Sequence, residues 1–205
     1  MNNMNIEKVN SNIPLGKQKI ADALRTLIMK KDFNLISIKD LTLESGYNET
    51  LVYRYFGNKR GLLHYVLEED VQKLFNQIKF DLKGIKGALN KIRKLVWSTI
   101  NFYAQNRVFA RIILLEVRNY EGYFDSHTYE LSRHYSQLLL RIIEEGVENG
   151  EIRSNLPAST IKRVILGSIE HLCLPGILFK LEILPDEMTE NLCDILFGGI
   201  IYKKE

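Results

Sequence analysis

The stretch from Ser37 to Lys59 constrains the fold more than any other part of the sequence, because two short helical patterns meet there at a glycine. Ser37 is a good N-cap, and Asp40 three residues later completes a capping box at the start of the first pattern. Gly46 can adopt the positive φ at which a helix ends and the chain turns. Asn48 can then cap a second short helix. The stretch therefore predicts a helix-turn-helix.

The second helix of this stretch has one face suited to packing and one suited to DNA. Val52 and Phe56 are four residues apart and can face the first helix, whereas Thr50, Tyr53 and Arg54 place hydrogen-bonding and cationic groups on the other face. A helix of this kind fits the major groove of B-DNA. We expect Thr50 and Asn48 to approach base edges, and Tyr53, Arg54, Tyr55 and Lys59 to contact phosphates. The candidate DNA-binding residues are Ser37, Asn48, Glu49, Thr50, Tyr53, Arg54, Tyr55 and Lys59.

The run ESGYNETLVYRYFGNKRGLL resembles the DNA-binding signature of TetR-family transcriptional regulators. The matching positions are Ser45 and Gly46 before the turn, Tyr53 and Phe56 in the second helix, Lys59, and the apolar pair Leu62 and Leu63. The sequence departs from the family at Tyr47, where a small aliphatic residue is usual, and at Asn48, where Ser is frequent. We expect these departures to affect which operator is read more than family membership, because Asn still caps a helix and Tyr can still pack.

The rest of the chain shows apolar residues at helical spacing and no alternation typical of strands, so we predict an all-α fold of about nine helices. The predicted domains are a flexible arm (1–14), a three-helix helix-turn-helix domain (15–60), and a helical effector-binding and dimerisation domain (61–205). In this last domain Pro175-Gly176 should stop or kink a helix that begins near residue 158, because proline lacks the N–H donor. Pro185 is well placed to start the final helix.

The last two predicted helices carry more apolar surface than one small domain needs. TetR-type regulators pair such helices across a two-fold axis into a four-helix bundle, so the resemblance implies a homodimer. The alternative is a helix pair buried within one chain. The candidate interface residues are Ile161, Val164, Ile165, Ser168, Leu172, Met188, Leu192, Ile195 and Leu196.

The resemblance also implies an effector pocket among the body helices, mostly apolar with a few orienting polar groups. The candidate lining residues are Trp97, Phe102, Tyr103, Phe109, Arg111, Arg118, His134 and Tyr135. The alternative for each aromatic residue is a place in the core. The segments RIILLEVRN and HYSQLLLRIIEEGVENGEIRSNL are similar to the family branch that responds to fatty acyl-CoA. An acyl chain would then occupy an apolar tunnel, with Arg111, Arg118 or Arg133 near the phosphates at its mouth.

Charge, cysteine and motif content agree with a regulator. Residues 1–65 hold ten Lys or Arg against six Asp or Glu, and the remaining residues hold 18 against 19, so the basic excess lies in the predicted DNA-binding part. The two cysteines lie in apolar helical patterns, and no signal peptide or membrane-length apolar run is evident, so we expect a cytoplasmic protein with no membrane partner. No phosphate loop or nucleophile elbow occurs, and Glu170-His171-x-Cys173 spreads its side chains over different helical faces, so we predict no enzyme, cofactor or metal site.

The sequence thus predicts a ligand-responsive repressor that a small hydrophobic effector, with fatty acyl-CoA as a candidate, releases from a palindromic double-stranded DNA operator. The alternative is an all-helical ligand- or partner-binding module whose helix-turn-helix serves only packing. Salt-dependent affinity for duplex DNA distinguishes the two, because neutralised phosphates release counterions.

Overall fold

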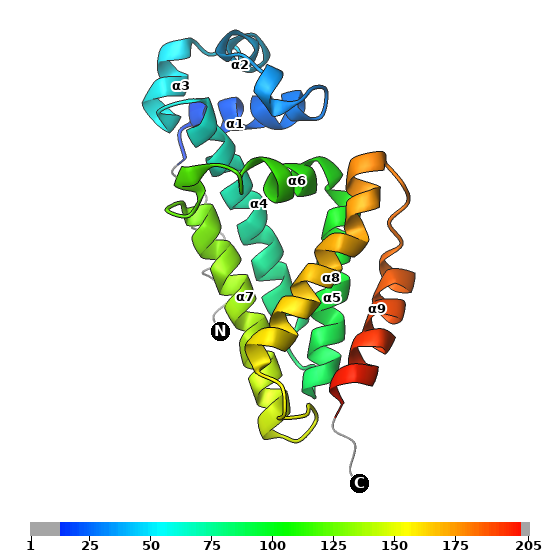
Figure 1. The fold of residues 1–205 in the computed structure, drawn as a ribbon. Coiled ribbons are helices and arrows are strands. Elements are labelled where there is room, and N and C mark those ends of the chain that lie inside the picture. Colours follow the sequence, from blue (N-terminus) through cyan, green and yellow to red (C-terminus); the bar gives the residue numbers. More distant parts are fainter. Residues whose placement is uncertain (1–12, 202–205) are drawn as a thin grey trace, which may run out of the picture. The chain divides into compact units, whose positions relative to one another are not determined.

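The computed structural model describes residues 13–201, so most of the predicted arm lies outside the described residues (Figure 1). Within this part of the chain the structure has nine α-helices, joined by short 3-10 and π-helical turns. A single isolated antiparallel bridge links Ile152 and Ile201. The predicted all-α class is therefore confirmed. The chain divides into two compact units, with the boundary between Glu69 and Asp70 inside α4 (Lys59–Asp81).

The first unit contains α1 (Leu15–Ile28), the 3-10 turn η1 (Phe33–Leu35), α2 (Ile38–Ser45), α3 (Glu49–Phe56) and the start of α4. The predicted capping box is present, because the Asp40 N–H donates to Ser37 Oγ (3.1 Å) and the Ser37 N–H donates to Asp40 Oδ2 (2.7 Å). Gly46 ends α2 with φ of 74°. The Leu51 N–H donates to Asn48 Oδ1 (3.1 Å), which caps α3. The predicted helix-turn-helix is therefore confirmed in its local detail.

The unusual Tyr47 packs against α1 at a glycine. A Cβ atom built at Gly16 would lie 3.2 Å from Tyr47 Cε1, so the absence of a side chain at position 16 makes room for the ring. The core of this unit includes Ile20 and Leu24 of α1 and Leu41 of α2, all fully buried. The departure from the family pattern at position 47 is thus accommodated by the neighbouring helix.

The second unit contains the rest of α4 and five further α-helices: α5 (Ala88–Gln105), α6 (Arg107–Arg111), α7 (His127–Glu148), α8 (Ala158–Phe179) and α9 (Pro185–Ile200). The π-helical turn η2 (Ile112–Glu116) extends α6, and the 3-10 turn η3 (Glu121–Tyr123) precedes α7. Helix α5 contacts α7, α8 and α9 (Figure 1), and its side chains Ile92, Leu95 and Ile100 are fully buried. It is the central helix of this unit.

Pro175-Gly176 was predicted to stop or kink the preceding helix. The helix does not stop there, because α8 continues through Pro175 to Phe179. Pro175 is exposed, and the carbonyl that its missing N–H would have bonded belongs to His171, which is exposed as well. Solvent can therefore replace the lost hydrogen bond. Gly176 has a packing role instead, since a Cβ atom there would lie 2.2 Å from Ile183 Cγ1. No helix in the described part of the chain is long and apolar enough to span a membrane.

Candidate functional site

Helix α3 presents the polar face that the sequence predicts. Val52 is fully buried, whereas Thr50, Tyr53 and Arg54 are exposed, with 47% of the Tyr53 surface open to solvent. A hydrogen bond to the carboxylate of Glu49 raises the pKa of Tyr53, which keeps its hydroxyl protonated at neutral pH. Arg54 is therefore available as a cationic donor, whereas the Tyr53 hydroxyl has to leave Glu49 before it can bond to DNA.

Three other candidate DNA-binding residues have a visible role within the first unit. The side-chain oxygens of Ser37 and Asn48 accept the capping hydrogen bonds of α2 and α3. Tyr55 is half-buried, with its ring edge-on to that of Phe56. Their contacts with DNA stay a prediction.

Lys59 is directed at the protein. Its ammonium Nζ donates to the carbonyl oxygens of Phe33 (3.0 Å) and Ile36 (2.7 Å), and it lies 4.5 Å from the centre of the Phe33 ring. Desolvation lowers the pKa of Lys59. The ammonium thus holds the connection that leads from η1 into the first helix of the motif, and the predicted phosphate contact stays a prediction.

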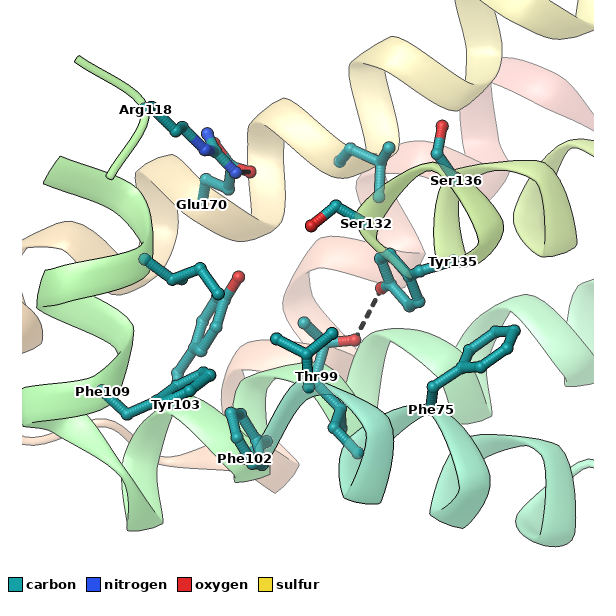
Figure 2. Close-up of a pocket in the computed structure, with 14 residues that line it drawn as sticks. Phe75, Thr99, Phe102, Tyr103, Phe109, Arg118, Ser132, Tyr135, Ser136 and Glu170 are labelled. Carbon is teal, nitrogen blue, oxygen red and sulfur yellow. Dashed lines mark hydrogen bonds and ion pairs between the residues drawn. The ribbon is translucent and has the colours of Figure 1, made fainter. Parts of the chain in front are cut away.

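The second unit has a partly open cavity of about 130 Å³ (Figure 2). Side chains from α4, α5, α6, η2, α7 and α8 surround it, together with Arg118, which follows η2. The lining residues are Val71, Leu74, Phe75, Thr99, Phe102, Tyr103, Phe109, Ile113, Arg118, Ser132, Tyr135, Ser136, Leu166 and Glu170. The wall is mainly apolar and carries a few polar groups, which is the composition of a small-molecule site.

Most of the predicted pocket residues meet at this cavity: Phe102, Tyr103, Phe109, Arg118 and Tyr135. Three others do not line it. Trp97 turns to the α5–α9 surface, where its Nε1 donates to Asp186 Oδ1 (2.6 Å). Arg111 is exposed on α6, and the His134 ring stacks on Phe75.

Sequence reasoning missed the cavity residues that have small or aliphatic side chains, and it also missed Phe75 and Glu170. A signal was present in three helices. Thr99 precedes Phe102 and Tyr103 by three and four residues, so these three share one face of α5. Ser132, Tyr135 and Ser136 repeat this spacing on α7. Val71, Leu74 and Phe75 show the same spacing on α4.

The polar groups of the cavity form two clusters. In one, Thr99 Oγ1 donates to the Leu95 carbonyl (2.8 Å) and the Tyr135 hydroxyl lies 2.7 Å from the same Oγ1. In the other, Arg118 makes a bidentate pair with Glu170, with N–O distances of 2.9 and 2.7 Å. The hydrogen bond to Glu170 raises the pKa of Arg118, and burial raises the pKa of Tyr135. Both side chains therefore keep their protons at neutral pH.

The side chains of Glu170-His171-x-Cys173, which were considered as metal ligands, point to different surroundings in the structure. Glu170 pairs with Arg118, His171 is exposed, and Cys173 is fully buried. Burial raises the pKa of the Cys173 thiol to about 11. Among residues 13–201 no group of three potential metal ligands comes together.

Helices α8 and α9 expose only part of the predicted dimer surface. Val164 and Ile195 are 51% and 76% exposed, and Ser168, Leu172 and Met188 are half-buried. The remaining four candidates face the core of their own chain, because these two helices also pack against the inside of the second unit: Ile161, Ile165, Leu192 and Leu196. Small residues extend the exposed face, since a Cβ atom at Gly167 or Gly199 would meet nothing within 4 Å.

Comparison with known proteins agrees with this geometry. A family model described as bacterial regulatory proteins of the tetR family matches residues 20–66, and one described as the C-terminal region of YsiA-like protein, within the same family, matches residues 67–180. The chain belongs to the TetR family. Proteins of this family are transcription regulators with a helix-turn-helix that binds DNA and a C-terminal domain that binds ligands, so the predicted class of protein is confirmed.

Among its relatives is the fatty acid metabolism regulator protein of Bacillus subtilis, which is 20% identical over 182 residues, covering 89% of this chain and 94% of that protein. The solved structure of the transcriptional regulator FadR from Bacillus subtilis in complex with stearoyl-CoA has a TM-score of 0.80 at 20% identity and covers 89% of this chain and 98% of its own. The ketosteroid transcriptional regulator KstR2 of Mycobacterium tuberculosis has a TM-score of 0.72 at 12% identity, covering 94% and 98%. At these identities the structures show that the fold is shared.

Proposed function

We propose that this TetR-family protein is a homodimeric repressor, rather than an enzyme, and that a small hydrophobic effector bound in the second unit releases it from a palindromic operator. The observation that carries the proposal is that one continuous helix, α4, contributes to both units. Its first turn carries Lys59, whose ammonium holds the η1 connection, and its later residues Val71, Leu74 and Phe75 line the cavity. A ligand that displaces these side chains shifts the population of α4 positions and thereby lowers operator affinity.

The DNA contacts follow from the exposed face of α3. Thr50 reaches base edges, whereas Tyr53 and Arg54 bind phosphates and fix the register of the helix in the major groove. One eight-residue helix reads few base pairs. Two such helices, about one helical turn of DNA apart, read the two halves of a palindrome. This requirement favours a dimer.

The exposed faces of α8 and α9 provide the dimer surface. Val164 on α8 and Ile195 on α9 expose apolar area, while Gly167 and Gly199 leave space for close approach. Two copies of this helix pair related by a two-fold axis would bury the same patch twice, as an isologous interface requires.

A fatty acyl-CoA is a candidate effector because the relatives include a fatty acid metabolism regulator and a structure with bound stearoyl-CoA. The cavity, at about 130 Å³, is smaller than a cavity of about 150 Å³ that accommodates benzene. A long acyl chain therefore has to widen it. Leu74 and Phe102 line both the cavity and a surface groove of about 490 Å³ between α4 and α5, so a shift of these two side chains is the direct way to join the two spaces.

Native mass spectrometry of the purified full-length protein, with and without a selected operator duplex, tests the proposal. We expect a dimer that binds one duplex, and a bound acyl-CoA or fatty acid would identify the effector class. A dimer without ligand that binds the duplex would support the repressor and exclude a tightly retained acyl-CoA. A monomer that binds no duplex would contradict the proposal and favour a helical binding module.

A further inference from the structure

The Tyr103 hydroxyl is the unusual group of the cavity. Tyr103 is 9% exposed, and Figure 2 shows its hydroxyl directed into the cavity, toward the side at which Arg118 and Glu170 lie. Among the residues that the structure describes, none forms a hydrogen bond with this hydroxyl, and no hydrogen bond contributes to its pKa shift. Because this hydroxyl opens on the cavity, its hydrogen bond is available to a ligand or to water there.

The neighbouring polar groups have partners inside the chain. Tyr135 is bonded to Thr99, whose own proton goes to the Leu95 carbonyl, and Ser132 Oγ donates to the Thr128 carbonyl (3.0 Å). Arg118 is engaged by both oxygens of Glu170. Tyr103 therefore offers a donor that the rest of the cavity leaves unused.

The charge of the cavity decides which acceptor fits this donor. Burial, with the nearby Tyr135 and Glu170, raises the pKa of Tyr103, so the hydroxyl keeps its proton and donates it. Arg118 is the cationic residue among those that line the cavity, and Glu170 already balances its charge, so it leaves a ligand carboxylate there without a free counter-charge. A neutral acceptor such as the carbonyl of a ketone, ester or amide needs no counter-charge.

We infer that the cavity binds a compact neutral molecule with an apolar body and a carbonyl oxygen, and that Tyr103 donates the hydrogen bond that orients it. Benzene fits a cavity of about 150 Å³, so the 130 Å³ present here sets the body at about the size of one ring. Part of a longer ligand that extends through the Leu74–Phe102 wall satisfies the same requirement. This inference rests on the proposed function, in which the cavity is the effector site.

Three matched probes test the inference on the full-length protein without DNA: ethylbenzene, acetophenone and benzoate. Dissociation constants are measured by ligand-observed NMR titration for the wild type and for Tyr103→Phe. The variant keeps the ring and removes only the unpartnered hydroxyl, so its fold is retained. We expect it to bind acetophenone about threefold to tenfold more weakly, the effect of one hydrogen bond, and to bind ethylbenzene as the wild type does.

Tyr129→Phe is the matched control, because Tyr129 lies half-buried on α7 and does not line the cavity. Its acetophenone affinity should equal that of the wild type. The inference is overturned if Tyr103→Phe weakens both neutral probes equally, if benzoate binds the wild type more tightly than acetophenone, or if none of the three binds. Since no DNA is used, a protein that fails to bind an operator would contradict the proposed function and leave this result unaffected.

Discussion

Replacing Lys59 with Met removes the ammonium that joins α4 to the η1 turn, and the structure sets the size of the effect. Three carbonyl oxygens lose a charged donor, at 3.0, 3.5 and 2.7 Å, and the two that make the shorter bonds belong to buried residues: Phe33 at 5% exposure and Ile36 at 1%. Hydrogen bonds to a charged group contribute about 1.5–3 kcal/mol, and part of this loss is recovered because Met packs its apolar stem. We therefore expect local unfolding of the η1–α2 connection to become easier by about 2–3 kcal/mol.

Hydrogen exchange followed by mass spectrometry measures this free energy locally, and amides at the start of α2 should exchange roughly 30- to 150-fold faster in the variant. Lys39→Met is the matched control, because Lys39 is exposed, and its exchange should not change. The salt dependence of DNA binding distinguishes a phosphate contact of Lys59 from its structural role at η1. A phosphate contact would lower the slope of log affinity against log salt by about 0.9, whereas the structural role leaves the slope unchanged. Unchanged exchange together with a lower slope would refute the reasoning.

Three further perturbations have expected outcomes. Hydrogen bonds from Lys31 and the Ser37 N–H hold the pKa of Asp40 well below its ordinary value of 3.8. The stability that the capping box contributes is therefore present above pH 3.8 and is lost as the pH falls below it. Far-UV circular dichroism should show a smaller acid-induced loss of stability in Asp40→Asn than in the wild type. Gly61→Ala should destabilise the protein by about 1–3 kcal/mol and lower the thermal midpoint, because the new Cβ atom would lie 2.0 Å from the Phe56 carbonyl oxygen. Helix propensity alone predicts a higher midpoint, and that result would contradict the geometry. Ile195→Glu places a charge on a side chain that is 76% exposed, so size-exclusion chromatography with light scattering should show a folded monomer; a persistent dimer would place the interface elsewhere.

The helix-turn-helix was predictable because its determinants are local. Ser37 with Asp40, Gly46 and Asn48 each act within a few residues of the chain, and the structure shows the capping bonds and the positive φ that these residue types predict. The continuation of α8 through Pro175 was not predictable from the same rules. It depends on the exposure of one carbonyl and on the packing of Gly176 against Ile183, which only the tertiary structure defines.

The cavity shows the same limit. Spacing places Thr99, Phe102 and Tyr103 on one face of α5, but it cannot tell whether that face meets a cavity or a filled core. Trp97 illustrates the ambiguity, because it lies on the same helix and points to α9. The Arg118–Glu170 pair joins residues 52 positions apart, so no local pattern reveals it.

The central claim is that a ligand in the second unit controls the DNA affinity of the first. Fluorescence anisotropy of a labelled duplex, recovered by in vitro selection with this protein, tests it between about 50 and 200 mM salt, with and without stearoyl-CoA. We expect affinity that falls steeply with salt and falls further when the ligand is present, and a cavity-filling Leu166→Trp variant should bind the duplex but lose the ligand response. Duplex affinity that is independent of stearoyl-CoA would exclude this ligand as the effector, and a response that is equal in the wild type and in Leu166→Trp would contradict the account.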